Sequence, residues 1–320
     1  MQMKVLHITN NYPTEKLPIF GIFVKEQIDS LSKIGVENEI FFINGREKGK
    51  KEYLNSIIKL RQLLKKRRFD VIHCHHVYSA ICLILSGYSG KNRTVISYQN
   101  DPTNEQGNKV FKLIKRKFDA IIFKNNSALV DSKKLFYQPN GVNTEFFRSI
   151  DRKECLKKLG LDADKRYLLF VSSNLIRNQK RYDRFTEVLR LLREKYNLHD
   201  VEELKLINTE RSLVPYYFNV SSLHLMTSDF EGSPNSVKEA MACNIPVIST
   251  DVGNVRELLW AVDGSFVADT KEVQELAELT YQALNDNLKV NSRDKLIEMK
   301  LDIDSVAYNI VLIYKKIIHE

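Results

Sequence analysis

The sequence predicts an α/β fold built from two doubly wound, Rossmann-like domains. Short apolar segments with the length of buried strands alternate along the chain with longer amphipathic segments that have helical spacing. This alternation is typical of parallel sheets that are covered by helices on both faces. The chain has 320 residues, which is enough for two domains of about 150 residues each.

The first half of the chain opens with a strand whose apolar core is too short for a secretory signal. Strands are expected at residues 4–9, 39–43, 69–73, 94–98 and 118–123, with helices at 23–34 and 54–66. A turn at residues 138–147 follows. We therefore expect an N-terminal domain at residues 1–150.

The second half, residues 151–320, repeats this organisation. Strands are expected at residues 167–171, 204–207, 222–227 and 245–249, with helices beginning near Ser233-Pro234 and in the segment 251–258. The chain ends in an amphipathic helix at about residues 303–318.

Composition points to a protein of the cytoplasm. The longest apolar run, residues 80–85, is far shorter than the roughly 20 residues that a membrane span needs. The four cysteines have neither metal-ligand nor disulfide spacing, and three of them lie in apolar segments.

Basic residues are concentrated in the first half of the chain. Residues 1–150 carry 25 Lys and Arg against 13 Asp and Glu, whereas the remaining residues carry 24 against 27. The basic clusters at 46–51, 65–68 and 109–117 are solvated helix faces or a surface for peripheral contact with an anionic membrane. No aromatic-interleaved motif accompanies them, so no nucleic-acid partner is expected.

The segment from Asp229 to Gly253 has the properties of a ligand site. Ser233 predicts a helix N-cap, with Pro234 at the first helical position. The N–H groups of such a first turn and the helix dipole favour a phosphate or diphosphate. Glu239 would lie roughly 7–8 Å further along the helix axis. That spacing suits a nucleotide whose ribose hydroxyls donate to the Glu239 carboxylate.

The same segment, with Glu231 and Glu239 separated by seven residues, resembles the donor-site pattern of retaining glycosyltransferases of family 4 (glycosyl transferases group 1). The resemblance is strong over residues 167–258 and weak over 91–134. It implies a GT-B fold, in which two Rossmann-like domains face each other across a cleft and the last helix crosses back to the first domain. It also implies a nucleotide-sugar donor, with neither a metal nor a cofactor.

The resemblance further implies roles for individual residues. Glu239 would hold the ribose, and Glu231 would contact the donor sugar or stabilise the developing oxocarbenium charge. Lys180 and Arg177, on the loop after the strand 167–171, would neutralise the diphosphate. The remaining donor-binding residues are Gly232, Ser233, Pro234, Asn235, Ser236 and, in the glycine loop of the first domain, Gly21.

Three segments depart from the family pattern. Ser172 and Ser173 replace the usual Gly-Arg pair, so the arginine role falls to Arg177. Residues 99–102 lack the histidine of the usual His-Gly-x-Asp, which leaves Asp101 as the nearest catalytic carboxylate. Residues 190–214 are shorter than the family's nucleobase-binding segment, so the sequence does not identify the nucleobase.

The string from His73 to His76 contains four potential metal ligands. Successive side chains of a strand point to opposite faces, so the four cannot all turn inward. We therefore expect no metal site here. The alternatives are that the string is a structural strand end or that His75 or His76 lies near the acceptor.

The sequence thus predicts a metal-independent, retaining glycosyltransferase of the hexosyltransferase type. It would transfer sugar to a hydroxyl of a glycan or lipid-linked acceptor in cell-surface polysaccharide synthesis, at the cytoplasmic face of the inner membrane. A non-catalytic nucleotide-sugar-binding or scaffold protein is one alternative. Another GT-B enzyme, such as a sugar-nucleotide epimerase, is the other.

Overall fold

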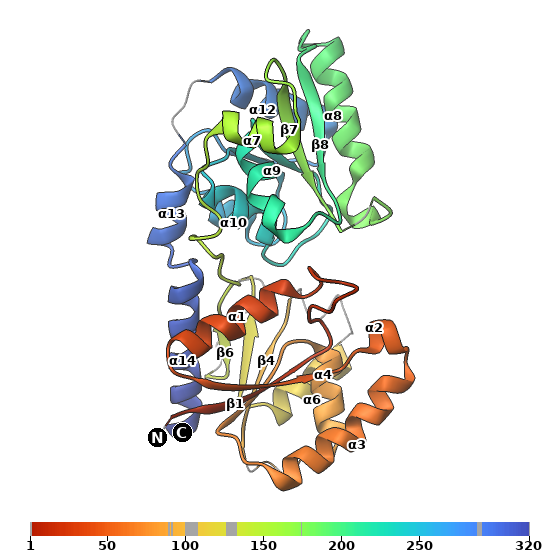
Figure 1. Ribbon diagram of the computed structural model, residues 1–320, viewed down its shortest axis with the longest axis vertical. Helices are drawn as coiled ribbons and strands as arrows, with labels where there is room; N and C mark the ends of the chain where they lie inside the picture. The colour runs from red at the N-terminus through yellow and green to blue at the C-terminus, as the bar shows by residue number, and fades with distance from the viewer. Residues whose placement is uncertain are drawn as a thin grey trace. The chain divides into compact units, whose positions relative to one another are not determined.

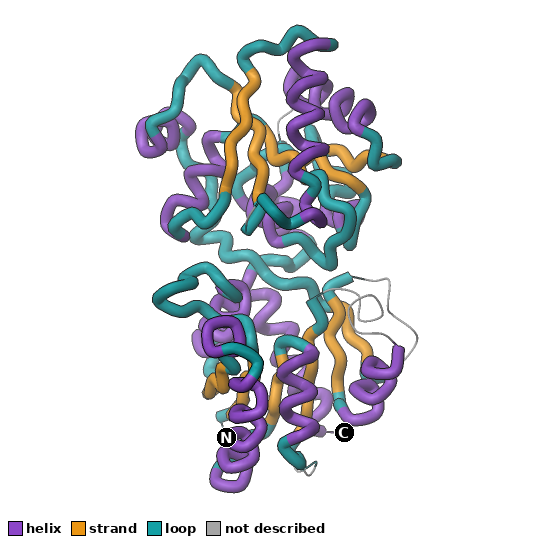
Figure 2. The backbone as a smooth tube through the Cα atoms, turned by 90° about the vertical axis from the view of Figure 1, so that its right-hand side faces the viewer, coloured by secondary structure: helices purple, strands orange, loops and turns teal. Residues whose placement is uncertain are grey.

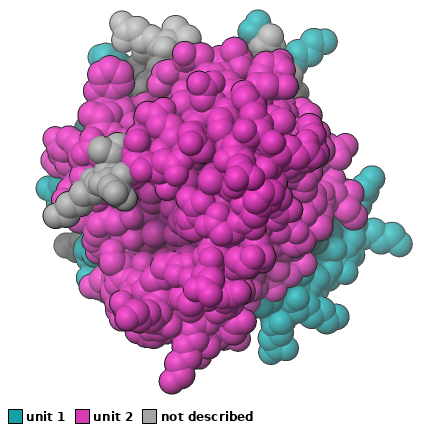
Figure 3. Space-filling model, turned by 90° about the horizontal axis from the view of Figure 1, so that it is seen from above, with its two compact units in different colours: residues 1–141, 303–320 teal, residues 142–302 magenta. Residues whose placement is uncertain are grey.

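The structure is a computed structural model that describes residues 2–88, 90, 92–99, 108–125, 133–173, 175–286 and 290–319. It divides into two compact units, shown in separate colours in Figure 3. Unit 1 comprises residues 1–141 and 303–320, and unit 2 comprises residues 142–302. The expected domain break at residue 150 thus falls a few residues inside unit 2, and the last helix belongs to unit 1.

Unit 1 is built on a parallel sheet of six strands in the order β2-β1-β3-β4-β5-β6. Figures 1 and 2 show this sheet with helices packed beside it. The strands are β1 Lys4–Thr9, β2 Glu37–Phe42, β3 Val71–Cys74, β4 Arg93–Ser97, β5 Ala120–Phe123 and β6 Leu135–Tyr137. The chain leaves β1 toward β2 on one side and then returns to place β3 on the other side. The order of the strands therefore reverses between β1 and β3, which is where ligands bind in open α/β sheets.

Helices cover both faces of this sheet. They are α1 Ile22–Lys33, α2 Gly45–Lys48, α3 Lys51–Lys66, α4 Val77–Leu85, α6 Asn108–Lys117 and α14 Ile303–His319. Side chains alternate along β1, so Leu6 joins the cluster with α3, α4 and α6, whereas Val5 joins the cluster with α14. The last helix thus supplies one side of the unit 1 core.

Unit 2 contains a second parallel sheet, of five strands in the order β11-β10-β9-β7-β8. The strands are β7 Arg166–Val171, β8 Val201–Leu206, β9 Leu223–Met226, β10 Val247–Thr250 and β11 Phe266–Ala268. The helices are α7 Arg152–Leu159, α8 Tyr182–Glu194, α9 Val214–Val220, α10 Asn235–Ala242, α11 Val255–Leu258, α12 Val273–Asn285 and α13 Ser292–Glu298, with short 3₁₀ turns η2 Asn178–Lys180 and η3 Arg211–Leu213. Here the strand order reverses between β7 and β9, so the loops after these strands meet at the switch point.

Candidate active site

The loop after β9 and the start of α10 form the centre of the site in unit 2. β9 is fully buried, and its His224 ties the strand to the first turn of α10. The ring Nδ1 lies 2.9 Å from the Leu169 carbonyl, which can only accept, so the neutral ring accepts at Nε2 from the Ser236 hydroxyl at 3.0 Å. Burial lowers the pKa of His224 to about 4, so the ring is neutral at pH 7.

The helix α10 begins at Asn235, one residue later than the sequence predicts. Pro234 is the N-cap residue, with an extended backbone (φ −67°, ψ 119°). Ser233 is therefore not the N-cap, and its hydroxyl instead accepts from Lys238 Nζ at 3.1 Å. Within the described residues, no side chain caps the first turn of α10. The backbone N–H groups of this first turn and the helix dipole make the helix start electropositive.

Lys180 and Glu231 come together from two different loops. Lys180 Nζ lies 2.7 Å from Glu231 Oε1, and each side chain is only 13% exposed. The Ser228 hydroxyl donates to the same carboxylate oxygen at 3.0 Å. The sequence predicted both residues for the site, and the structure pairs them directly.

Backbone and side-chain bonds hold the two loops together. The Thr227 hydroxyl lies 2.9 Å from the Lys180 carbonyl and 3.0 Å from the Arg181 carbonyl. The Asp229 N–H donates to the Gln179 carbonyl at 2.9 Å. The Asp229 carboxylate in turn accepts from Arg181 and from Arg184, whose side chain is 7% exposed. These bonds fix the position of Lys180 relative to α10.

Arg177 does not join this group. Its side chain is exposed and donates to Gln179 Oε1 at 3.1 Å. Its expected role at the diphosphate stays a prediction.

Gly232 packs against the loop that follows β10. Its carbonyl accepts from the Asn254 N–H at 3.2 Å. Gly253 has a φ of +59°, and a Cβ at this position would lie 2.3 Å from the Gly232 carbonyl oxygen. Gly253 was not predictable as a site residue from the sequence, because the close approach depends on the neighbouring strands β9 and β10.

Gly253→Ala should therefore destabilise unit 2 and distort the Gly232 loop. The backbone conformation alone is expected to cost about 1–3 kcal/mol, and the contact with Gly232 adds to this. Gly160→Ala is the matched control, because Gly160 has a φ of +65° and, apart from its chain neighbours, no atom of the described residues lies within 4 Å of its Cβ position. Urea denaturation should show a larger loss for Gly253→Ala; equal losses would mean that the loop contact is unimportant.

Glu239 is paired with a residue that the sequence analysis missed. Arg211 Nη1 lies 3.3 Å from Glu239 Oε1, and the two side chains are 23% and 15% exposed. The guanidinium also lies over the rings of Phe146 and Phe147, 5.1 and 4.9 Å from their centroids. Arg211 belongs to the shortened segment after β8. Its guanidinium thus contacts the Glu239 carboxylate, to which the sequence predicts that ribose hydroxyls donate.

Unit 1 holds the remaining candidates. Gly21 has a φ of +70°, and a Cβ there would lie 2.3 Å from the Asn11 carbonyl carbon, so its backbone requires glycine independently of any ligand. Asp101 lies outside the described residues.

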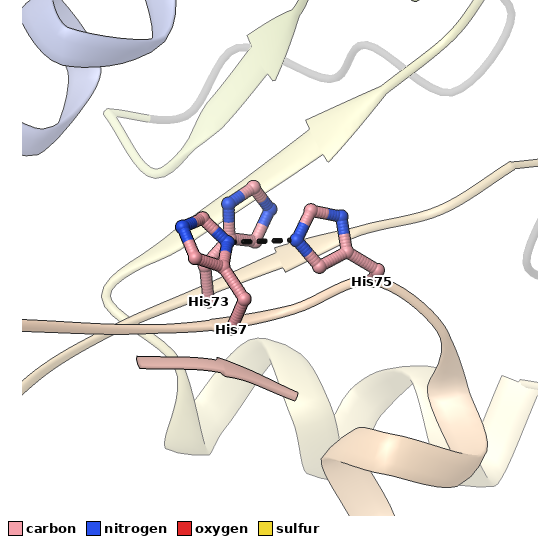
Figure 4. A group of neighbouring side chains, drawn as sticks. All are labelled: His7, His73 and His75. Atoms are coloured by element: carbon pink, nitrogen blue, oxygen red, sulfur yellow. Dashed lines mark hydrogen bonds between the residues drawn. The ribbon is translucent and has the colours of Figure 1, made fainter. Parts of the chain in front are cut away.

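Three histidines of unit 1 form a buried cluster at the switch point between β1 and β3 (Figure 4). His7 pairs with His73 in the parallel register, and His75 follows on the same side as His73. One ring nitrogen from each lies within 4.8 Å of the others. The string from His73 to His76 gives no sign of His7, which joins it only through the pairing of β1 with β3.

Hydrogen bonds occupy this cluster. His7 Nε2 lies 2.7 Å from Asn38 Oδ1, and His7 Nδ1 lies 2.9 Å from His75 Nε2. His73 bonds the Tyr314 hydroxyl at 2.6 Å and the Ser97 hydroxyl at 2.9 Å. A metal ion would have to replace some of these bonds, so we assign the cluster to the unit 1 core. The expectation of no metal stays a prediction.

Two protein-family models match the chain, one in each half. The model described as "Glycosyl transferase 4-like" matches residues 24–127, and the model "Glycosyl transferases group 1" matches residues 204–300. The second match includes Glu231 and Glu239, and together the two span more than half of the chain.

Relatives of known activity match most of the chain at low identity. An Escherichia coli UDP-Gal:alpha-D-GlcNAc-diphosphoundecaprenol alpha-1,3-galactosyltransferase is 22% identical, with 76% of this chain and 75% of that protein covered. The N-acetyl-alpha-D-glucosaminyl L-malate synthase of Bacillus anthracis is 20% identical, with 75% and 73% covered.

Solved structures share the fold. Sucrose-phosphate synthase from Thermosynechococcus elongatus aligns with a TM-score of 0.79 at 15% identity, covering 98% of each chain. Anabaena HepE in complex with UDP-glucose aligns with a TM-score of 0.72 at 14% identity, covering 98% of this chain and all of that chain (100%). No described helix is both long and apolar enough to cross a membrane. The two parallel α/β units and the likeness to these solved structures show the GT-B fold. The two family matches show that the chain belongs to the group 1, family 4 glycosyltransferases.

Proposed function

We propose that this glycosyltransferase is a metal-independent, retaining enzyme of the hexosyltransferase type that uses a nucleotide-diphosphate sugar as donor. The observation that carries the proposal is the Lys180–Glu231 pair, held at the uncapped start of α10. A nucleoside diphosphate gains negative charge as it leaves the sugar. A fixed ammonium and helix-end amides stabilise that charge more in the transition state than in the ground state.

Each residue of the pair has its own part in the proposed reaction. Lys180 neutralises the departing diphosphate, which takes the place of a metal ion. Glu231, which Lys180 and Ser228 hold in place, contacts donor-sugar hydroxyls or stabilises the developing oxocarbenium charge in this proposal. The acceptor is a hydroxyl of a glycan or lipid-linked saccharide. The Escherichia coli relative, named for a diphosphoundecaprenol-linked substrate, supports this choice.

We place the reaction in the cytoplasm, at the cytoplasmic face of the inner membrane, as a step of cell-surface polysaccharide synthesis. The donor is tested first with a panel of UDP-, GDP-, ADP- and TDP-sugars. A ligand that binds only the folded protein raises its melting temperature, so one nucleotide family should stabilise the chain. Stabilisation by none of them would count against a donor site. Conversion of the donor sugar into its epimer without an acceptor would favour an epimerase, and the anomeric configuration of the transfer product tests retention.

Glu239→Gln should weaken donor binding by about 10- to 100-fold, because a hydrogen bond to a charged group contributes roughly 1.5–3 kcal/mol. The variant keeps the size of the side chain but removes the charge that attracts the ribose hydroxyls and pairs with Arg211. Glu278→Gln is the control, since Glu278 is exposed on α12 of the same unit. Isothermal titration with the donor found in the panel measures both affinities. Unchanged affinity in Glu239→Gln would remove the ribose from this position.

A further inference from the structure

An outward-facing stripe of α3 combines exposed aliphatic residues with cations. Leu54, Ile58, Arg61 and Lys65 follow one another at spacings of four, three and four residues, so they lie on one face of the helix. The opposite face carries the buried residues Glu52, Ser56 and Leu60. The stripe therefore points away from the core of unit 1, and Figure 1 shows α3 along the outside of this unit beside α4.

The aliphatic half of the stripe is exposed. Leu54 is 66% exposed and Ile58 is 60% exposed. A third aliphatic residue, Leu85 at the end of the neighbouring α4, is 61% exposed. A helix in water gains nothing from aliphatic side chains on its outer face, whereas a helix that lies on a bilayer inserts them below the headgroups.

The basic half of the stripe borders a hollow of about 250 Å³ between the end of α3 and the start of the loop after α4. Arg61, Lys65 and Arg68 line it on one side, and Ser86 and Gly87 line it on the other. A Cβ on Gly87, whose φ is +73°, would lie 3.1 Å from Arg61 Nη2, so the glycine makes room for the guanidinium. The hollow has the size and charge to hold an anionic headgroup.

Charge in this region is strongly one-sided. Residues 46–68 contain ten Lys and Arg against two Glu. Among the described residues Lys59 pairs with Glu52 and Arg67 with Glu39, and these pairs include none of Arg61, Lys65 and Arg68. The net positive charge is complementary to an anionic lipid surface.

We propose that the outer face of α3 is the membrane-docking surface of this protein. Leu54 and Ile58 enter the bilayer interface, and the hollow formed with Arg61, Lys65 and Arg68 binds the phosphate of an anionic lipid. The proposal rests on the proposed function, because an acceptor on a lipid carrier requires the enzyme at the membrane.

Vesicle flotation tests the proposal with the full chain. The vesicles contain phosphatidylcholine alone or phosphatidylcholine mixed with phosphatidylglycerol. The wild-type chain should bind only the anionic vesicles, and less at high salt. Arg61→Glu/Lys65→Glu should lower the partition coefficient about tenfold or more. Leu54→Gln/Ile58→Gln should lower it as well, at unchanged net charge.

The control reverses two cations on the other face of the same sheet. Lys33→Glu/Lys315→Glu, on α1 and α14, changes the net charge as much as the basic-stripe variant does. An equal loss of binding in this control would mean that net charge alone drives attachment and would overturn the assignment of α3. Failure of the wild-type chain to bind anionic vesicles would overturn it too. Donor binding in vesicle-free buffer tests the proposed function separately, and melting curves show that each variant is folded.

Discussion

Lys180→Ala is expected to lower kcat for sugar transfer by about 100- to 1000-fold, the usual cost of removing one fixed donor that stabilises transition-state charge. Water cannot easily take the place of the Lys180 ammonium, because the side chain is only 13% exposed and Thr227 holds its loop. The affinity for the intact donor should change much less than kcat, since most of the charge develops only when the bond to the diphosphate breaks. Initial rates of nucleoside diphosphate release measure the effect.

Two further variants separate this role from charge and from folding. Lys205→Ala removes an exposed lysine of β8 that pairs with Glu203, and it should leave kcat unchanged. Lys180→Arg keeps a cation but changes its geometry, so it should recover part of the rate. If Lys180→Ala turned over within a few-fold of the wild-type rate while remaining folded, the charge on the leaving group would have to be stabilised elsewhere.

The fold could be predicted from the sequence because the inner strands of both sheets are largely buried on both faces. A strand that is covered by helices on both faces forms a short, largely apolar segment. β3, β5, β9 and β10 are buried at every residue, and β5 is apolar throughout, whereas a histidine interrupts β3 and β9, and β10 ends in Ser249 and Thr250. The start of β8 was missed, because Glu202 and Glu203 interrupt its apolar pattern. These two residues are only partly buried in β8, and Glu203 accepts from Tyr182 at 2.6 Å.

The site could be predicted only where its residues are neighbours along the chain. Glu231 and the start of α10 lie in one segment, so their spacing was informative. The contact of Glu239 with Arg211 was not predictable, because the order of β7, β8 and β9 in the sheet decides which loops meet. Lys238 was missed for another reason. A lysine in a helix is normally solvated, whereas this one is fully buried and contacts Ser233.

The histidine cluster in unit 1 could not be predicted from the sequence either, since His7 and His75 are 68 residues apart and meet only through the pairing of β1 with β3. Its consequence concerns stability rather than catalysis. Burial lowers the pKa of His7 to about 4 and lowers the pKa values of His73 and His75 well below the ordinary value of 6.5. Burial also lowers the pKa of the nearby Lys124 to about 7.

The protein should therefore lose stability in acid. Between pH 6.5 and about 4, unfolded His7 binds a proton that the folded state excludes, so the free energy of unfolding falls as the pH falls through this window. A shift from 6.5 to about 4 corresponds to about 3 kcal/mol for His7 alone. His73 and His75 act in the same direction. Lys124 has the same effect at higher pH. Between its ordinary pKa of 10.5 and about 7, the free energy of unfolding also falls as the pH falls.

Replacing His7 by glutamine isolates this contribution. The amide of Gln can donate to Asn38 and accept from His75, as His7 does, but it does not titrate. Between pH 6.5 and 4, the free energy of unfolding of His7→Gln should fall by about 3 kcal/mol less than that of the wild-type chain. Urea unfolding followed by circular dichroism measures both. His199→Gln is the control, because His199 is exposed and bonds only to Asn197 among the described residues; it should show the full wild-type loss. If His7→Gln showed that same full loss, folded His7 would titrate near its ordinary pKa. Water would then have to reach the ring, or β1 would have to rearrange, before the unit unfolds.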